Sequence, residues 1–208
     1  MLMYNIFREV IFIENIIESS NLNIENLIKE IYKYKESYDT NGRKISNVGG
    51  YQSWDFNWDI IEPNNIEYKE LNSLFSSIHN NLLNITYGAE ASVNISNAWV
   101  SINHKHDYNR SHQHPNSIFS GVFYLQNPED SESIIKFHRS REFSDYSMSR
   151  YINHDLDHSY WSEAFEIFPQ AGDLLIFPSY MFHEVYPNRA ESSRISIAFN
   201  TTYAQMDN

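Results

Sequence analysis

The sequence predicts a mainly β fold with supporting helices near the N-terminus. From about residue 91, short runs of β-branched and aromatic residues alternate with turn residues, which is typical of antiparallel sheets. Before that point, apolar residues recur at helical spacing in two stretches. The length of 208 residues suits one all-β domain. We therefore expect a single domain over 1–208, in which 1–90 form an α+β support and 91–204 form the β core.

The support is predicted to contain one strand and two helices. Residues 5–13 are apolar and mixed, as in an opening strand. Asn21 or Asn23 can cap a helix over 23–36, because apolar residues follow at helical spacing. A second helix is predicted over 67–84, with one apolar stripe made of Leu71, Leu74, Phe75, Ile78 and Leu82. The pair Gly49-Gly50 between the helices predicts a turn.

The β core is predicted from seven short runs of strand-forming residues. They cover 93–104, 118–126, 133–138, 164–168, 173–177, 181–186 and 193–202. The gap at 139–163 is polar and rich in tyrosine, and it is long for a loop in a compact domain. The length of this gap indicates either a lid over a functional site or a disordered excursion, and we predict a lid.

Composition excludes several classes of function. The chain has no cysteine, which rules out disulfides, thiolate nucleophiles and cysteine-ligated metals, and fits a cytoplasmic protein. The start does not resemble a signal peptide, and no stretch is long and apolar enough to span a bilayer. The net charge of −12 disfavours nucleic-acid binding. One locally basic stretch is interpreted as a solvated loop; it contains Lys136, Arg139, Arg141 and Arg150.

Histidines are the candidate metal ligands. The chain has nine of them, and two pairs have His-x-His spacing, His104/His106 and His112/His114. In an extended chain, residues i and i+2 point to the same face, so either pair could bind one ion. Such a pair is weak evidence by itself. The remaining histidines, at 79, 138, 154 and 158 together with the pair at 104 and 106, are interpreted as ordinary polar or loop residues.

Two downstream features favour the second pair. His183 follows the segment 172–178, which reads as a turn, a buried strand and a turn. Arg194 then opens a strand on which Ile195, Ile197 and Phe199 form the core-facing side. A half-buried arginine needs an anionic partner, because an unpaired buried charge is costly. That partner is either a nearby carboxylate or a ligand carboxylate, which arginine can grip in a bidentate fork.

Together these patterns resemble the 2-oxoglutarate/Fe(II)-dependent oxygenase superfamily, and in particular a family of oxygenases from bacteria and their phages. The resemblance covers roughly residues 46–200. Its motifs are Ser46–Ser53, Asn97–Val100, His112–Ser117 with Ser120–Leu125, Gly172–Pro178, His183, and Arg194–Asn200. The combination is specific, although no single motif is.

The resemblance implies a double-stranded β-helix, a jelly-roll relative of the cupins, with Fe(II), 2-oxoglutarate and O₂ as cofactor and co-substrates. His112 matches the first iron ligand and His183 the distal one. Arg194 matches the residue that holds the far carboxylate of 2-oxoglutarate, and Ser196 completes an Arg-x-Ser pattern. The hydroxyl of Tyr124 either reaches the co-substrate or the ring simply packs in the core.

The chain departs from the usual pattern at His114. Most of the superfamily has a carboxylate there, whereas the His-x-His-Pro family does not. If His114 is an iron ligand, we expect it to share a strand face with His112. Three interpretations remain open: His114 is an iron ligand, it supports the site without touching the metal, or the site prefers zinc or nickel. Of the nearest acids, Asp107 could join the site, while Glu184 alternates away from His183.

The resemblance implies a hydroxylase acting on a peptide side chain or a small molecule. Several aromatic residues could line its cleft: Trp99, Tyr146, Tyr151, Tyr160, Trp161 and Tyr180. One alternative is a cupin-like dioxygenase with three histidines that does not use 2-oxoglutarate, which leaves Arg194 unexplained. Another is a non-catalytic jelly-roll module for binding or structure. A homo-oligomer is compatible with the sequence.

Overall fold

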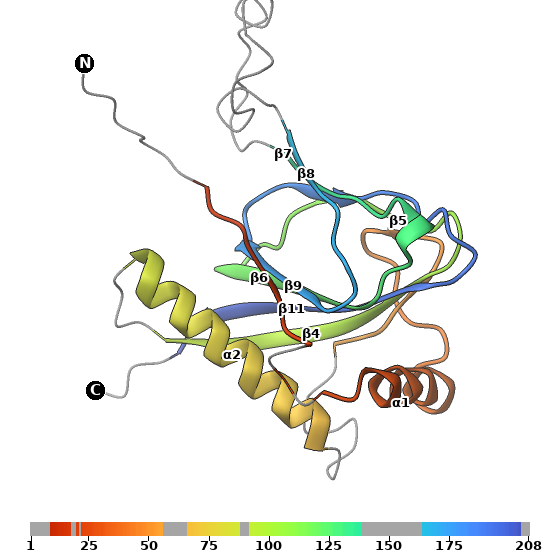
Figure 1. Ribbon diagram of the computed structural model, residues 1–208, viewed down its shortest axis with the longest axis horizontal. Coiled ribbons are helices and arrows are strands. Elements are labelled where there is room, and N and C mark those ends of the chain that lie inside the picture. Colours follow the sequence, from red (N-terminus) through yellow and green to blue (C-terminus); the bar gives the residue numbers. More distant parts are fainter. Residues whose placement is uncertain are drawn as a thin grey trace, which may run out of the picture.

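The computed structural model describes residues 9–17, 20, 22–55, 66–87, 92–138 and 164–204 (Figure 1). In these residues two antiparallel sheets face each other and two α-helices lie outside them. This is the mainly β architecture that the sequence predicts. The segment 139–163, interpreted above as a lid, lies outside the described residues.

The strands form one six-stranded and one five-stranded sheet. The first has the order β1-β9-β6-β11-β4-β3 and the second β2-β5-β10-β7-β8. The first sheet contains β1 (Phe12–Asn15), β3 (Tyr51–Gln52), β4 (Val93–Asn103), β6 (Phe119–Gln126), β9 (Asp173–Pro178) and β11 (Arg194–Tyr203). The second contains β2 (Asn47–Val48), β5 (Tyr108–His112), β7 (Ile135–His138), β8 (Ala164–Ile167) and β10 (His183–Val185).

From β4 onward the chain passes back and forth between the sheets. β4, β6, β9 and β11 belong to the six-stranded sheet, whereas β5, β7, β8 and β10 belong to the other. Eight antiparallel strands shared between two sheets in this way make a jelly roll. The path brings residues far apart in sequence onto neighbouring strands, so that β5 pairs with β10 and β11 with β6.

The helices cover the outer face of the six-stranded sheet (Figure 1). Helix α1 (Ile24–Ser37) begins after Asn23, whose side chain accepts a hydrogen bond from the Asn26 N–H at 3.0 Å, as an N-cap does. Helix α2 (Ile66–Tyr87) buries Phe75, whose ring stacks on Phe199 of β11 at 4.9 Å. A Cβ on Gly121 would lie 2.1 Å from the Phe199 ring, so only glycine fits there.

Strand periodicity divides the two faces of β11. Ile195, Ile197 and Phe199 join the core under the helices, as predicted. Arg194 and Ser196 therefore point between the sheets. A second apolar cluster lies between the sheets and includes Tyr124, Ile135, Phe137, Leu175 and Phe177. The alternation along β11 therefore directs the Arg194 and Ser196 side chains into the interior of the jelly roll.

Some predicted bounds were wrong. The opening strand lies at Phe12–Asn15 rather than 5–13, because its pairing with β9 sets its position; residues 1–8 lie outside the described part. Strand β5, Tyr108–His112, was missed because its polar sequence shows no apolar alternation. The predicted turn at Gly49 and Gly50 joins β2 to β3, with φ of +70° and +57°.

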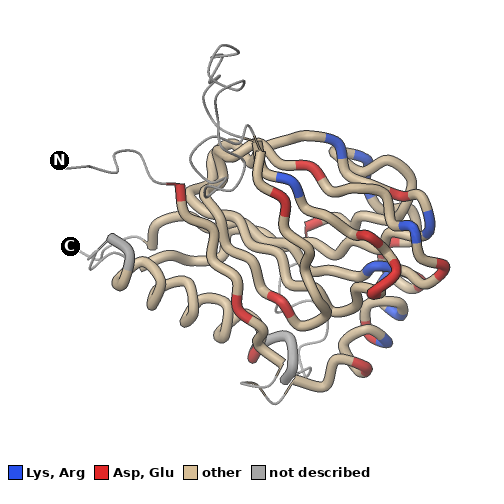
Figure 2. Tube along the Cα trace, turned by 45° about the horizontal axis from the view of Figure 1, so that its top comes forward, with Lys and Arg blue, Asp and Glu red and all other residues tan. Residues whose placement is uncertain are grey.

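Charged residues are mixed along the surface. Figure 2 shows Lys and Arg interspersed with Asp and Glu along the loops and strands that the structure describes. Lys136, from the locally basic stretch, donates to the Tyr186 hydroxyl and lies 3.7 Å from Glu166. Among the described residues, no helix combines the length and the apolar character needed to cross a membrane.

Candidate active site

Three histidines meet between the sheets. His112 ends β5, His183 begins β10, and the two residues are directly paired across these strands. Their side chains and that of His114 each offer a ligand nitrogen, and these atoms lie within 4.8 Å of one another. Among the described residues, this is the group of metal-ligating side chains that the fold brings together.

Backbone carbonyls orient two of these rings. His112 Nδ1–H donates to the Arg110 carbonyl at 2.7 Å, and His183 Nδ1–H donates to the Met181 carbonyl at 3.0 Å. Because these bonds use the Nδ1 protons, each Nε2 keeps a free lone pair. A hydrogen bond of this kind is the usual support of a metal-bound histidine.

His114 is held differently from the other two. Strand β5 ends at His112, so the prediction that both residues share a strand face is wrong. The chain turns at Asn116, which has a φ of +65°. The His114 ring nevertheless joins the group, because it lies nearly parallel to the Trp99 ring at 5.5 Å and to the His183 ring at 5.1 Å.

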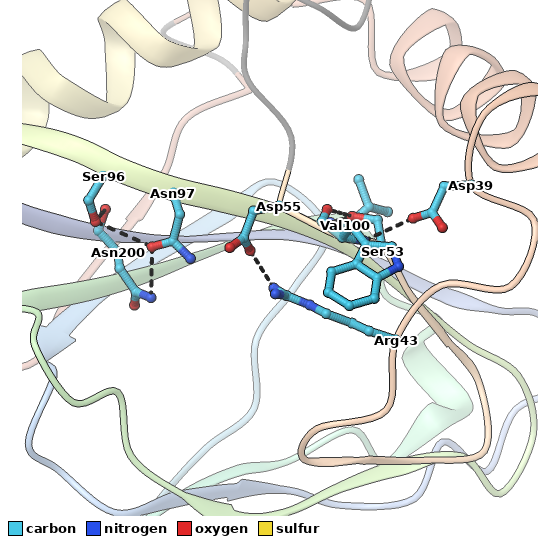
Figure 3. A network of polar contacts seen from close by, with 9 residues as sticks. Asp39, Arg43, Ser53, Asp55, Ser96, Asn97, Val100 and Asn200 are labelled. Carbon is cyan, nitrogen blue, oxygen red and sulfur yellow. Dashed lines mark hydrogen bonds and ion pairs between the residues drawn. The ribbon is translucent and has the colours of Figure 1, made fainter.

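A polar chain anchors the loop that carries His114. The His114 backbone N–H donates to the Ser179 carbonyl at 2.9 Å. The Ser179 hydroxyl meets the Ser120 hydroxyl at 2.9 Å, and Ser120 donates to Asn200 Oδ1 at 2.7 Å. Asn200 Nδ2 donates in turn to Asn97 Oδ1 at 3.1 Å (Figure 3). Three strands of the six-stranded sheet, β4, β6 and β11, thereby support the third histidine.

The three imidazoles are neutral at neutral pH. Burial lowers the pKa of His112, and burial together with the charge of His112 lowers the pKa of His114 to about 3. The pKa of His183 lies well below its usual value, first because of burial and then because of the charge of His112. Neutral imidazoles are the form that binds metal, so little proton competition is expected near pH 7.

The spacing of the nitrogens fits a single ion. His114 Nε2 and His183 Nε2 are 3.4 Å apart. Two imidazole nitrogens bound to one ion at about 2.1 Å, with angles of roughly 90–110°, would lie about 3.0–3.4 Å apart. Imidazole ligands suit iron, and equally zinc, copper and nickel, so this donor set fits Fe(II) without selecting it.

Arg194 also lines this cavity. Its guanidinium is a buried cation, and one of its nitrogens has no hydrogen-bond partner among the described residues. Its residue is 2% exposed, and Nη1 donates to Ser133 Oγ at 2.9 Å and to the Tyr186 carbonyl at 3.1 Å. Nη2 is buried and has no partner among the described residues. A buried guanidinium without a bonded carboxylate is costly, so the site fits an anionic ligand. No pattern in the sequence indicated that Ser133 and Tyr186 would bind Arg194.

The cavity has a closed inner end and an open mouth. Its volume is about 260 Å³. Arg194, Tyr124 and Ser196 are buried at the inner end, whereas Gln113 and Pro115 are exposed at the mouth. Burial raises the pKa of Tyr124 to about 12, so its hydroxyl stays protonated and can donate a hydrogen bond. The fold therefore brings all six residues predicted for the site to one cavity.

Other candidates lie elsewhere. Asp107 accepts from the His104 N–H at 2.8 Å and is not part of the histidine group. Glu184 turns away from His183 toward His138, as predicted, at 3.1 Å. The other described histidines, His79, His104, His106 and His138, also lie outside the group. Trp99 lines the cavity and Tyr180 does not; Tyr146, Tyr151, Tyr160 and Trp161, together with His154 and His158, lie outside the described residues.

Comparison with known families agrees with this arrangement. Residues 97–200, half of the chain, match the family described as "Putative 2OG-Fe(II) oxygenase". The chain belongs to this family of oxygenases. Its members use Fe(II), 2-oxoglutarate and O₂, so the predicted cofactor and co-substrates are confirmed at the level of the family. No curated protein matches the chain.

Solved structures of low sequence identity share the fold. A Pseudomonas putida prolyl-4-hydroxylase is 15% identical, with 92% of each chain covered and a TM-score of 0.58. A Trichoplax adhaerens prolyl hydroxylase in complex with a hypoxia inducible factor peptide fragment is 17% identical, with 92% of this chain and 82% of that chain covered and a TM-score of 0.61. A viral collagen prolyl hydroxylase from Paramecium Bursaria Chlorella virus-1 is 12% identical, with 94% and 96% covered and a TM-score of 0.57. The predicted double-stranded β-helix is thereby confirmed.

Proposed function

We propose that the chain is an active hydroxylase in which His112, His114 and His183 hold Fe(II). In this proposal Arg194 binds the distal carboxylate of 2-oxoglutarate. The observation that carries it is the buried Arg194 Nη2, which has no partner among the described residues, on a side chain that lines the same cavity as the three histidines. A carboxylate suits this nitrogen, because it is an anion and its oxygens accept charge-assisted hydrogen bonds.

Each side chain has a defined task in this proposal. When bound, iron with 2-oxoglutarate and O₂ supplies the oxidising chemistry that hydroxylates an unactivated C–H bond and releases succinate and CO₂. Arg194 sets the orientation of 2-oxoglutarate by holding its far end, while the Tyr124 and Ser196 hydroxyls, which line the same inner end, add hydrogen bonds. The closed inner end excludes water from the co-substrate.

The ligand set explains why the co-substrate should be a dianion. Three neutral imidazoles leave the full charge of a divalent ion unbalanced, whereas a carboxylate ligand would remove one unit of it. No aspartate or glutamate lines the cavity among the described residues. Asp107 acts on the charge of Arg194 from outside the cavity lining, and no carboxylate of the lining meets the ion or bonds to Arg194. An anionic ligand in the cavity would supply the missing negative charge. Doubly anionic 2-oxoglutarate does this with one carboxylate near each cation.

The wider proposal covers substrate, organisation and location. We place residues 1–208 in a single domain with its support at 1–90 and its jelly-roll core at 91–204. The substrate is proposed to be a peptide side chain or a small molecule, and the location cytoplasmic. A dioxygenase with three histidines that does not use 2-oxoglutarate is the weaker candidate, because it leaves the Arg194 guanidinium unpaired.

Anaerobic reconstitution tests this function. Adding Fe(II) and then 2-oxoglutarate to the purified protein should produce a visible metal-to-ligand charge-transfer band, since 2-oxoglutarate then chelates the iron. Admission of O₂ should release succinate. A protein that binds Fe(II) by equilibrium dialysis yet gives neither the band nor succinate would be a binding module or an oxygenase of another kind.

A further inference from the structure

One wall of the cavity has residues that the co-substrate does not explain. Arg43, Gln52 and Trp99 line it, on the side of β3 and β4. Several neutral carboxamides complete the lining of the cavity: Asn97, Asn103, Asn109, Gln113 and Asn200. In the six-stranded sheet Gln52 pairs with Ser101, which pairs with Ser196, so strand β4 separates this wall from the residues assigned to 2-oxoglutarate. A substrate would therefore meet the protein at this wall.

The backbone holds this wall firmly. The Arg43 N–H donates to the Gln52 carbonyl at 2.8 Å, so the two residues lie opposite each other. Gln52 pairs with Ser101 of β4. Next along the chain, Ser53 and Val100 exchange two hydrogen bonds, each of 2.9 Å, one of which uses the Ser53 hydroxyl (Figure 3). The positions of Arg43 and Gln52 therefore follow those of the sheet.

Arg43 has an anionic partner, but one of its nitrogens has no hydrogen-bond acceptor among the described residues. Nη2 donates to Asp55 Oδ1 at 2.5 Å (Figure 3). The guanidinium also lies 5.5 Å from the centre of the Trp99 ring and 5.9 Å from that of Trp54, as in cation–π contacts. Nε, however, is buried and has no partner among the described residues. Because Asp55 already supplies a negative charge, Arg43 needs an additional acceptor rather than an additional anion.

Gln52 has a hydrogen-bond acceptor that lacks a donor among the described residues. Its residue is 4% exposed, and its Oε1 is buried with no partner among the described residues. A buried polar atom without a hydrogen bond costs about 1–3 kcal/mol. Among the described residues, the wall therefore carries one unmet donor, Arg43 Nε, and one unmet acceptor, Gln52 Oε1, on residues whose backbones are hydrogen-bonded to each other.

We propose that this wall binds a secondary amide of the substrate, and that the substrate is a peptide. The amide carbonyl accepts from Arg43 Nε and the amide N–H donates to Gln52 Oε1. A lone carboxylate would place an anion against Gln52 Oε1, and a lone ammonium would place a cation against Arg43. A peptide group satisfies both atoms without bringing in charge, in keeping with the neutral carboxamides around it. This inference rests on the proposed function, because it assigns the substrate of the same site.

Matched probes can test the amide directly. The probes are N-acetyl amino acid N-methylamides that cover the common side chains. Each probe has two amide N–H groups. Two matched esters are made for each probe, and in each ester oxygen replaces a different one of these N–H groups. The free amino acid is the third comparison. Binding is measured by ligand-observed NMR on metal-free protein, and succinate release is measured on protein loaded with Fe(II) and 2-oxoglutarate. One of the two esters should bind about 5- to 150-fold more weakly than its diamide, because it leaves Gln52 Oε1 unmet.

Variants locate the effect. Gln52→Leu should abolish the preference for amide over ester, whereas Gln170→Leu, which changes an exposed glutamine outside the cavity, should keep it. Arg43→Leu should weaken the diamides and both esters alike, since all of them keep the carbonyl groups. Equal binding of amide and esters by the wild-type protein would overturn the proposal. Tighter binding of the free amino acid would also overturn it, in favour of a zwitterion site.

The failure of this inference can be told apart from failure of the proposed function. A charge-transfer band with no amide preference would refute the peptide assignment alone. Absence of the band, with Fe(II) bound, would refute the proposed function, and NMR on the metal-free protein would still decide whether the wall prefers an amide.

Discussion

Replacing Arg194 by leucine should greatly weaken the binding of 2-oxoglutarate. Arg194 is 2% exposed and its Nη2 has no partner in the part of the chain that the structure describes, so the co-substrate carboxylate would form a buried charge pair with the guanidinium. Losing one side of such a pair costs about 2–5 kcal/mol, which corresponds to a loss of affinity of about 30-fold or more. Isothermal titration of the metal-loaded protein under anaerobic conditions measures the dissociation constant.

The control for Arg194 is a ligand that lacks the distal carboxylate. 2-Oxopentanoate keeps the chelating end of 2-oxoglutarate, so wild type and Arg194→Leu should bind it with similar affinity. This comparison separates the carboxylate contact from any damage caused by losing the hydrogen bonds to Ser133 and Tyr186. If Arg194→Leu bound 2-oxoglutarate normally, or lost both ligands equally, Arg194 would not be the carboxylate anchor. Arg194→Lys offers a second variant if the leucine protein does not fold.

Three further predictions concern the histidines. His112→Ala or His183→Ala should abolish Fe(II) binding in equilibrium dialysis, whereas His104→Ala should not; equal damage from His104→Ala would mean that the other His-x-His pair binds the metal. His114→Ala should weaken Fe(II) binding, with His114→Asp intermediate because its shorter side chain restores a charged ligand, and unchanged affinity in both would remove His114 from the ligand set. Burial lowers the pKa of His79 to about 4 in the folded protein, from about 6.5 in the unfolded chain. As the pH falls from 6.5 to 4, the unfolded chain binds a proton that the folded protein does not bind. The free energy of unfolding should therefore fall by up to about 3 kcal/mol over this range. His79→Leu should lose that part of the pH dependence in urea unfolding and should be more stable at pH 7, because both ring nitrogens lack partners among the described residues; an unchanged pH profile would contradict this account.

The strand pattern was predictable wherever one face of a strand is apolar. On β11 the alternation correctly placed Arg194 on the face opposite Ile195, Ile197 and Phe199, and the structure shows that this face lines the cavity. The same reasoning missed β5, whose sequence is polar on both faces and of which Asn109 and His112 line the cavity. It also placed His114 on a strand that ends two residues earlier. Hydrophobic periodicity shows which face of a strand is apolar, and it gives no signal for a strand that has no apolar face.

What the sequence by itself determined is the set of chemical groups and the faces on which they lie. Strand alternation gave the faces of the strands, and the resemblance carried by the motifs implied the roles of the histidines, Arg194, Ser196 and Tyr124, because both are local properties of the chain. Only the tertiary structure decided how those groups are supported. Ser179 and Trp99 hold His114, Ser133 and Tyr186 hold Arg194, and Arg43 faces Gln52, through contacts between distant segments. Whether a buried polar atom has a partner depends on how the sheets pack, and no local pattern in the sequence records it.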